Sequence, residues 1–323
     1  MSPSPRPELS VVCPMYNESA KIAESIGRLR AVLQRLGRSW ELILVNDGST
    51  DGTGEAARQA IGGDPAIHLI DYSPNRGRGY ALRRGFAKAR GEWILSTESD
   101  LTWGEAVLER LPAALETAGV DFAIASPHMP GGRLENVPGL RVFLSRYGNR
   151  LLCLALGRRT TMASGMTRCY RAEVLRALDL ESDDKEIHLE ILSKAYALGF
   201  RSVDVPAVLR WEPERKRRGF PSAKLLRFAW THLLFGFQEG PFLLFGTAGL
   251  GLMGLGTLCG GYAAWLSIGG TPVAGRPLLT VTLLCLLFGL QILLFAFLAA
   301  QLLELRRQNI RLQRKWAQRE SQS

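Results

Sequence analysis

Polar side chains that can bind metal and phosphate follow three apolar segments in the first hundred residues. These clusters are residues 16–18, 46–51 and 98–100. In the last cluster, Glu98 and Asp100 stand one residue apart, and two such hard oxygen ligands can share a divalent cation, Mg²⁺ or Mn²⁺. A fourth cluster, residues 75–81, places glycines and Arg78 at the start of a predicted helix, where a cation can meet a diphosphate.

Strands and helices are predicted to alternate along the first 200 residues. Apolar β-prone runs predict strands at residues 9–13, 42–45, 67–70, 93–96, 122–125 and 202–205. Helical patterns lie at residues 19–36, 55–61, 79–89, 104–117, 140–156 and 184–198. This alternation predicts an α/β fold with a mostly parallel sheet, whose ligands bind beyond the carboxyl ends of the strands. The polar clusters follow those ends, so one crevice can collect them.

Two long apolar segments near the C-terminus predict membrane-spanning helices. No charged residue occurs in residues 240–275 or in residues 277–303, and each stretch exceeds the roughly 20 residues that cross a bilayer. Buried core helices are the alternative, but core helices of this length rarely lack charge on every face. We therefore predict spans at about residues 241–267 and 278–303.

Basic residues flank the predicted spans on one side of the membrane. They are Arg215, Lys216, Arg217, Arg218, Lys224 and Arg227 before the first span, and Arg306, Arg307, Arg311, Arg314 and Lys315 after the second. The loop between the spans carries only Arg276, so the positive-inside rule places both ends in the cytoplasm. The polar, Pro-rich start has no apolar stretch of signal-peptide length, so the large domain is expected to stay there too.

The other basic segments of the chain also fit a protein bound to a membrane. Residues 223–239 mix apolar and basic side chains and predict an amphipathic helix in the membrane interface. The formal net charge of +10 is explained by anionic headgroups, and nucleic acid is not a predicted partner. In the basic tail, residues 305–323, apolar spacings of three and four leave two alternatives open, a solvated helix or a helix that pairs with its copies in a homo-oligomer. The five cysteines show no close spacing and predict neither a disulfide framework nor a zinc site.

Four motifs resemble those of the family 2 glycosyltransferases, whose fold is the nucleotide-sugar-binding GT-A type. They read Pro14-Met15-Tyr16-Asn17-Glu18, Asn46-Asp47-Gly48-Ser49-Thr50-Asp51-Gly52-Thr53, Asn75-Arg76-Gly77-Arg78-Gly79-Tyr80-Ala81 and Glu98-Ser99-Asp100. The resemblance implies that Asp47 accepts a hydrogen bond from the nucleotide base, while Tyr16 and Glu18 frame the nucleoside. It also implies a donor site that includes Pro14, Asn17, Asn75, Arg78 and Ser99, and a metal held by Glu98 and Asp100.

The chain departs from the family pattern at several positions. Asn46 and Glu98 stand where the family usually carries Asp, and Arg78 replaces Lys. Glu98 keeps the charge on a longer arm, which changes the expected metal geometry. No Asp occurs at Thr161 or Met166, where relatives carry a residue often considered the catalytic base. Glu190 is the candidate that could replace this aspartate as the catalytic base. The alternative is that Glu190 is a capping or solvated glutamate of a helix.

The acceptor side resembles the polyprenyl-phosphate branch of the family, which includes dolichyl-phosphate mannose synthase. Arg133 and Arg141, with Asp100 and Glu190, are the predicted catalytic residues. The predicted contacts to a lipid phosphate are Arg146, Arg168, Arg217, Arg218, Ser222 and Lys224. A lipid phosphate monoester has a second pKa near ~6 and is already largely dianionic at neutral pH, so it needs positioning more than deprotonation.

The resemblance implies a metal-dependent, inverting enzyme that moves a hexose from a UDP- or GDP-sugar to a polyprenyl phosphate. The expected order is a cytoplasmic GT-A domain at residues 1–222, the interfacial helix, two spans within residues 240–304 and the tail. Such a chain is a multi-pass protein of the cytoplasmic membrane. Two alternatives remain: a catalytically silent nucleotide-sugar-binding or scaffold protein, and a glycosyltransferase acting on another lipid or polysaccharide acceptor.

Overall fold

The structure is a computed structural model that describes residues 6–157, 159–210, 241–270, 272–273 and 277–320. Contacts within the chain define two units, residues 1–153 with 157–219 and residues 154–156 with 220–323. The first unit contains the sheet and the second contains two long helices.

Seven strands form the main sheet, in the order β3-β2-β1-β4-β7-β5-β8. They are β1 (Leu9–Met15), β2 (Trp40–Asp47), β3 (Ile67–Tyr72), β4 (Trp93–Ser96), β5 (Phe122–Ser126), β7 (Arg168–Arg171) and β8 (Ser202–Pro206). Only β7 pairs antiparallel to its neighbours, β4 and β5. The predicted α/β fold with a mostly parallel sheet is therefore confirmed.

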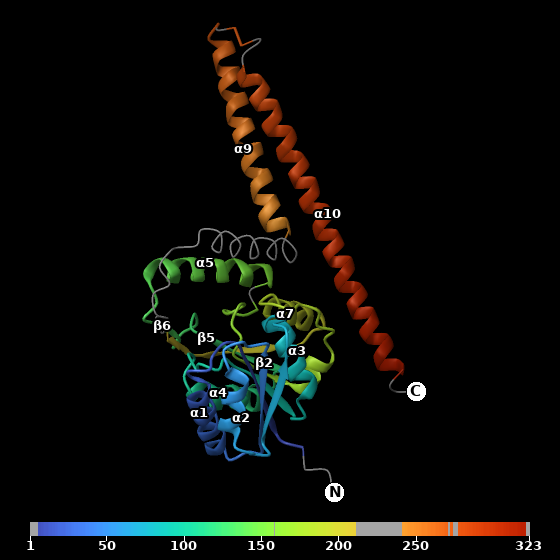
Figure 1. Ribbon diagram of the computed structural model, residues 1–323. Coiled ribbons are helices and arrows are strands. Elements are labelled where there is room, and N and C mark those ends of the chain that lie inside the picture. The colour runs from blue at the N-terminus through green and yellow to red at the C-terminus, as the bar shows by residue number, and fades with distance from the viewer. Residues whose placement is uncertain (1–5, 158, 211–240, 271, 274–276, 321–323) are drawn as a thin grey trace. The chain divides into compact units, whose positions relative to one another are not determined.

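Helices lie between these strands along the chain (Figure 1). They are α1 (Ile22–Arg35), α2 (Thr53–Ile61), α3 (Arg78–Lys88), α4 (Ala106–Ala118), α5 (Gly139–Ala155), α6 (Ala172–Arg176) and α7 (Ile187–Ala197). In α1 the buried residues Ile22, Ile26, Leu29 and Leu33 recur at spacings of three and four, which gives one apolar stripe. Two short strands, β6 (Arg133–Glu135) and β9 (Val208–Arg210), pair separately and are absent from the sequence-based prediction.

The parallel register brings the polar clusters to one edge of the sheet. Met15 at the end of β1 lies opposite Asn46 on β2, and Asn46 lies opposite Asp71 on β3. On the other side of β1, Val12 lies opposite Ser96 at the end of β4. Because these strands run parallel, the loops that follow β1, β2, β3 and β4 lie at the same end of the sheet.

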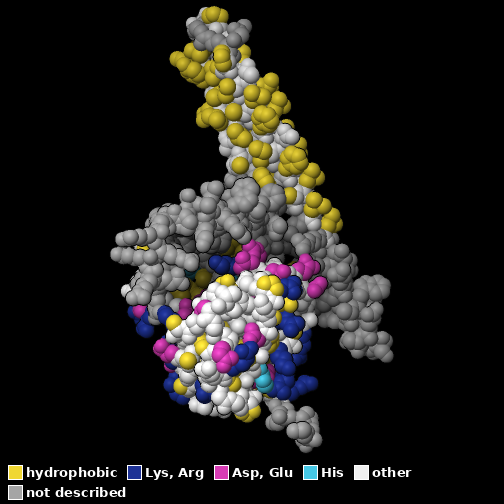
Figure 2. All heavy atoms as spheres, viewed as in Figure 1, with side chains coloured by type: hydrophobic (Ala, Val, Ile, Leu, Met, Phe, Trp, Pro, Cys, Tyr) yellow, Lys and Arg dark blue, Asp and Glu magenta, His cyan; other side chains and the backbone are white. Residues whose placement is uncertain are grey.

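The second unit contains α9 (Pro241–Ile268) and α10 (Pro277–Glu320). The helices approach closely at glycines, since a Cβ on Gly249 would lie 2.8 Å from the carbonyl oxygen of Gly289. Phe245–Ile268 and Pro277–Leu302 are long and apolar enough to cross a membrane, with mean hydropathies of 1.2 and 2.6. Figure 2 shows hydrophobic side chains over their outer surface. The predicted interfacial helix at 223–239 lies outside the described residues.

A buried carboxylate joins β1 and β2 to the loop before β4, at the opposite end of the strands. Glu41, at the start of β2, is 2% exposed and accepts hydrogen bonds from Ser10 Oγ at 2.6 Å and from the Arg90 backbone N–H at 2.8 Å. The Arg90 guanidinium also donates to it through Nε and Nη2, at 3.0 and 2.9 Å. Burial raises the pKa of Glu41, but the hydrogen bonds from Ser10 and Arg90 outweigh burial and leave the pKa below its ordinary value.

Replacing this carboxylate should destabilise the fold in a pH-dependent way. We expect Glu41→Ala to cost about 2 kcal/mol, or roughly 4–8 °C in Tm, because the Ser10 hydroxyl and the Arg90 N–H lose their acceptor. Since the folded pKa is lowered, the stabilisation is complete above roughly pH 4.3 and is lost as the pH falls through the folded value. Thermal unfolding of both proteins between pH 3 and pH 8 tests this, and a difference that widens in acid would contradict it. Glu55→Ala, at an exposed ion pair with Arg58, is the control and should change stability by less than about 0.5 kcal/mol.

Candidate functional site

The loops after β1 and β2 are bonded to each other. Asn17 accepts a hydrogen bond from the Thr50 N–H at 3.0 Å, and its own N–H donates to Ser49 Oγ at 3.0 Å. The Glu18 N–H donates to Thr53 Oγ1 at 2.7 Å, and the Ser19 N–H donates to the Asp51 carboxylate. The hydroxyls and the aspartate of the second motif therefore hold the first motif in place, a role that turn chemistry alone did not reveal. Tyr16, which is 48% exposed, is left facing solvent.

Asp47 binds the loop that follows β3. Its carboxylate accepts from the hydroxyl of Tyr72 at 2.9 Å and the side-chain amide of Asn75 at 2.8 Å. It also accepts from the backbone N–H groups of Arg76 and Gly77, at 2.8 and 3.0 Å. A carboxylate offers about four acceptor positions, and here protein donors occupy them. The predicted hydrogen bond from a nucleotide base to Asp47 stays a prediction, and in this structure the carboxylate shapes the 72–77 loop.

The backbone at the start of α3 is also engaged within the protein. The N–H groups of Gly79 and Tyr80 donate to the carbonyl oxygen of Asp183, at 2.8 and 3.1 Å. A Cβ on Gly77 or Gly79 would lie 2.3–2.4 Å from a carbonyl oxygen of residues 182–183. These glycines therefore let the backbone of residues 182–184 approach the start of α3. The Arg78 side chain, 38% exposed, is left to meet a phosphate.

Carboxylates gather at the turn after β4. Glu98 is half-buried and accepts from Trp103 Nε1 at 3.1 Å and Thr102 Oγ1 at 3.2 Å, and Arg78 lies 3.4 Å from its other oxygen. Burial, opposed by Arg78 and reinforced by Asp100, raises the pKa of Glu98. Burial likewise raises the pKa of Glu18, which accepts a hydrogen bond from the buried Ser99 hydroxyl. The turn therefore concentrates more negative charge than Arg78 offsets.

This donor set fits a divalent cation. Asp100 is exposed and accepts one hydrogen bond, from the Thr102 N–H at 3.0 Å, so most of its oxygen lone pairs are free. Glu98 adds an oxygen that faces only Arg78. Among the described residues no group of three acidic, histidine or cysteine side chains could hold a metal alone. Two carboxylates suit Mg²⁺ or Mn²⁺ when water and ligand phosphate complete the coordination.

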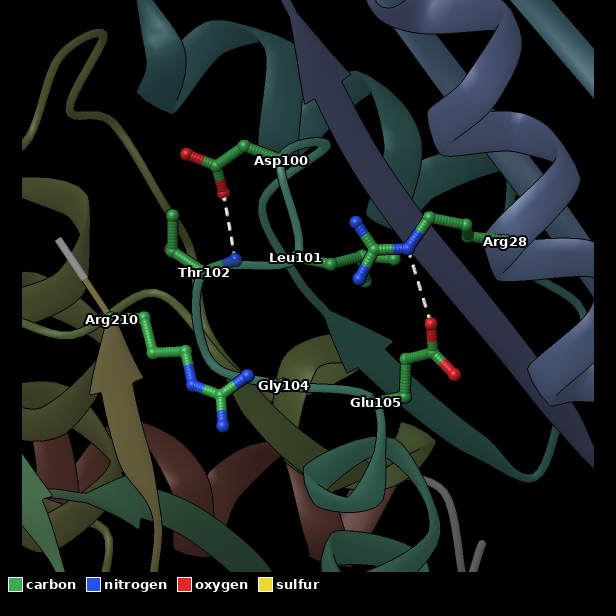
Figure 3. A pocket seen from close by; sticks show the side chains of 7 residues that line it. All are labelled: Arg28, Asp100, Leu101, Thr102, Gly104, Glu105 and Arg210. Carbon is green, nitrogen blue, oxygen red and sulfur yellow. Dashed lines mark hydrogen bonds and ion pairs between the residues drawn. The ribbon is translucent and has the colours of Figure 1, made fainter. Parts of the chain in front are cut away.

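A hollow of about 270 Å³ adjoins Asp100 (Figure 3). Its lining includes Arg28 from α1 and Arg210 at the end of β9. Arg28 pairs with Glu105 at 3.1 Å, and Arg210 pairs with Glu135 on β6 at 2.9 Å. The Arg210 N–H donates to the Thr102 carbonyl at 2.9 Å, which fixes β9 beside the turn that carries Asp100. Sequence reasoning missed both arginines, since neither lies in a motif.

The predicted acceptor residues that the structure describes lie on β6, α5 and β7. Arg133 on β6 and Arg146 on α5 are exposed, and Arg141 lies in α5. Arg168 is a correction, because it is fully buried and donates to the carbonyls of His188 at 2.8 Å and Ala163 at 2.6 Å, out of reach of a lipid phosphate. Four predicted residues lie outside the described residues: Arg217, Arg218, Ser222 and Lys224.

The two positions that lack the family aspartate differ in their surroundings. Met166 is buried, whereas Thr161 donates its N–H and hydroxyl to the Asp204 carboxylate on β8, at 2.5 and 2.6 Å. Strand β8 therefore supplies a carboxylate, that of Asp204, beside Thr161. Asp204 also accepts from Thr160 at 2.8 Å, so it fixes this loop to the sheet. No motif in the sequence pointed to Asp204.

The mostly parallel sheet, with its motif loops beyond the carboxyl ends of the strands, is a GT-A fold. Residues 10–179 match the family described as Glycosyl transferase family 2, and the chain belongs to that family. The fold is similar to that of glucosyl-3-phosphoglycerate synthase from Mycobacterium tuberculosis, solved with Mn²⁺, UDP and glucosyl-3-phosphoglycerate, with a TM-score of 0.50 and 20% identity over 83% of this chain and 82% of that one.

The sequence is also similar to proteins whose names refer to polyprenyl phosphates. The undecaprenyl-phosphate mannosyltransferase of Micrococcus luteus is 31% identical over 201 residues, which cover 60% of this chain and 80% of the relative. The polyprenol monophosphomannose synthase of Mycolicibacterium smegmatis is 32% identical over 203 residues, 61% of this chain and 75% of the relative. An undecaprenyl-phosphate 4-deoxy-4-formamido-L-arabinose transferase of Shewanella sediminis is 28% identical over 78% of this chain and 73% of the relative.

The replacement of the family aspartate by Asn46 has a local cause in the structure. Asn46 is 3% exposed, and its Nδ2 donates to the carboxylate of Asp71 on β3 at 2.9 Å. Arg58 pairs with the other oxygen of Asp71. An aspartate at position 46 would face Asp71 as a second anion and could not donate to it. The side-chain amide of Asn46 therefore complements the carboxylate of Asp71 on the neighbouring strand.

Restoring the family residue should consequently harm this chain. We expect Asn46→Asp to lower stability by about 2 kcal/mol, through like-charge repulsion and a lost hydrogen bond. Adding Asp71→Asn to the same chain should recover most of that loss, because the new amide on β3 can donate to the new carboxylate on β2. A double-mutant cycle by thermal unfolding measures the coupling. Additive losses, or no loss in the single variant, would refute the explanation.

Proposed function

We propose that the chain transfers a hexose from a UDP- or GDP-sugar to a membrane polyprenyl phosphate, with inversion at the anomeric carbon. The observation that carries the proposal is the combination of two features in one chain. Tyr16, Arg78 and Asp100 keep exposed surface at the end of the sheet where the four motifs meet. Two helices long enough to cross a membrane follow this domain. The names of the relatives, which pair a sugar with a polyprenyl phosphate, support the same class of acceptor.

On the donor side, each exposed group has a part. The Tyr16 ring borders the nucleoside, and the Arg78 guanidinium meets the diphosphate. Asp100 and Glu98 would hold a divalent cation, which supplies positive charge to the departing nucleoside diphosphate. The solved structures of glucosyl-3-phosphoglycerate synthase with UDP and Mn²⁺ or Mg²⁺ support such a cation here.

On the acceptor side, the reaction needs a positioned phosphate. A lipid phosphate oxygen attacks the anomeric carbon, a new C–O bond forms, and the bond to the nucleoside diphosphate breaks with its electron pair. At neutral pH the attacking oxygen already lacks its proton, so no protein base has to remove one. We place the phosphate among Arg133, Arg141 and Arg146, with Arg217, Arg218, Ser222 and Lys224 at the membrane surface.

The proposed location is the cytoplasmic membrane, with the catalytic domain and both ends inside. The charge-free stretches and the basic residues on either side of them support this orientation. The domain order proposed with it is residues 1–222 for catalysis, 223–239 for the interfacial helix, 240–304 for the spans and 305–323 for the tail.

A second candidate is a protein that binds nucleotide-sugar without turning it over. The carboxylates at the metal site support it, since Glu98 replaces the usual aspartate and is already engaged by Trp103, Thr102 and Arg78. The two candidates are separated by assaying purified full-length protein with radiolabelled UDP- and GDP-sugars and undecaprenyl phosphate, with Mg²⁺, with Mn²⁺ and with chelator. Label in the organic extract that depends on metal identifies the transferase. Nucleotide binding without transfer from any donor points to the silent protein or to another acceptor.

The active-site assignment makes a specific prediction for Asp100. Asp100→Ala should lower kcat/KM by at least about 10²–10³, because the cation loses its most accessible ligand. Glu109→Ala, at an exposed position in α4, is the control and should keep wild-type activity. Unchanged transfer by a folded Asp100→Ala protein would remove Asp100 from the site.

A further inference from the structure

Residues 179–184 form a strap between α7 and α3, and Glu190 fixes it on the α7 side. The Glu190 carboxylate accepts from the backbone N–H groups of Glu181 and Ser182, both at 2.9 Å. Lys194, one turn further along α7, lies 2.7 Å from the same carboxylate and also donates to the Asp179 carbonyl. Glu190 and its partner Lys194 thus hold the strap at three points of its backbone, residues 179, 181 and 182.

The other side of the strap closes the start of α3. The Asp183 carbonyl accepts from the N–H groups of Gly79 and Tyr80, at 2.8 and 3.1 Å. The approach is tight, because a Cβ on Gly79 would lie 2.4 Å from the Ser182 carbonyl oxygen and 2.7 Å from that of Asp184. Arg83 adds a hydrogen bond to the Leu180 carbonyl at 3.3 Å and an ion pair with Asp183.

The helix start that the strap closes carries Arg78. Arg78 is the first residue of α3, and its Nη1 lies 3.4 Å from Glu98 Oε1 at the carboxylate turn. The N–H groups on either side of Arg78 are used by Asp47 and Asp183, and its side chain keeps 38% of its surface exposed, where it can meet a phosphate. The direction of that side chain follows the first turn of α3, which the strap holds.

We propose that Glu190 is a positioning residue that acts through the strap to aim Arg78 at the donor diphosphate, and that it is not the catalytic base. The inference rests on the proposed function for the identity of the donor. Three N–H donors surround the carboxylate of Glu190, which leaves it little capacity to accept a proton from a substrate. Burial raises its pKa, but Lys194 and the amides of the strap outweigh burial and lower it, which weakens it as a base.

The test uses full-length protein in detergent and variants at the two ends of the strap. Glu190→Gln leaves one acceptor oxygen for two amides and places an NH₂ group against an N–H. Gly79→Ala pushes the strap away from α3 at the other end. Glu181→Gln is the matched control, since it removes one charge from an exposed side chain of the strap. UDP and GDP, each with Mg²⁺, are titrated into every protein, and donor KM, kcat and their pH profiles are measured in the transfer assay.

A positioning role predicts the same defect in both variants. Affinity for the nucleotide that binds the wild type should fall about tenfold, donor KM should rise to match, and the shape of the pH profile should not change. The double variant should be no worse than the poorer single variant, because both act through one strap. Amide hydrogen exchange at Gly79 and Tyr80 should accelerate in Glu190→Gln and stay at the wild-type rate in Glu181→Gln.

Other outcomes overturn the proposal. Wild-type nucleotide affinity and donor KM in Glu190→Gln, with kcat reduced and the acidic limb of its pH profile lost, would make Glu190 the base. Wild-type exchange at Gly79 and Tyr80 would show that the strap does not depend on Glu190. If Glu190→Gln does not fold, Glu190→Asp carries the same test, because it keeps both oxygens on a shorter arm. Nucleotide binding and exchange do not require transfer, so failure of the proposed function leaves this inference measurable.

Discussion

The site depends on a closed ring of hydrogen bonds that joins the loops after β1, β2, β3 and β4. The loop after β1 is bonded to that after β2 through Asn17 and Glu18, and the loop after β2 is bonded to that after β3 through Asp47. Arg78 then reaches Glu98 after β4, and Ser99 returns the ring to Glu18. Because each loop is held by its neighbours, the exposed groups need no ligand to bring them together, and little ordering entropy remains to oppose binding.

The ring also explains why so few motif side chains are free to meet a ligand. Asp47 is 4% exposed and Ser99 is 3% exposed, and both are engaged within the chain. The Asp47 carboxylate accepts from four donors of the chain, and removing Asp47 would leave those donors without their acceptor. Most motif residues are consequently committed to the shape of the site. Tyr16, Arg78 and Asp100 keep exposed surface for chemistry.

Much of this could be predicted from the sequence, and the limits have physical causes. Apolar runs with turn residues between them gave the strands up to β5 and the parallel sheet, since such patterns depend on local burial. The strand β7, with the sequence Arg-Cys-Tyr-Arg, escaped prediction because its burial comes from strands β4 and β5 on either side. Arg168 was predicted at the surface for the same reason, as only its tertiary contacts show that its charge is buried against carbonyls. The glycines of the third motif were recognised, but the segment that they admit lies about a hundred residues later in the chain.

The residues that replace the family aspartates are explained by the carboxylates that lie next to them. Asn46 stands opposite Asp71, where a second carboxylate would be repelled, and Thr161 stands against Asp204, which already supplies a carboxylate from β8. Neither replacement removes a group that an anionic acceptor requires, because a phosphate monoester arrives deprotonated. A hydroxyl acceptor would need a base close to the donor, and the carboxylates of Glu190 and Asp204 each already accept three hydrogen bonds within the chain. This distribution of hydrogen bonds supports the proposed lipid phosphate, an acceptor that brings its own negative charge.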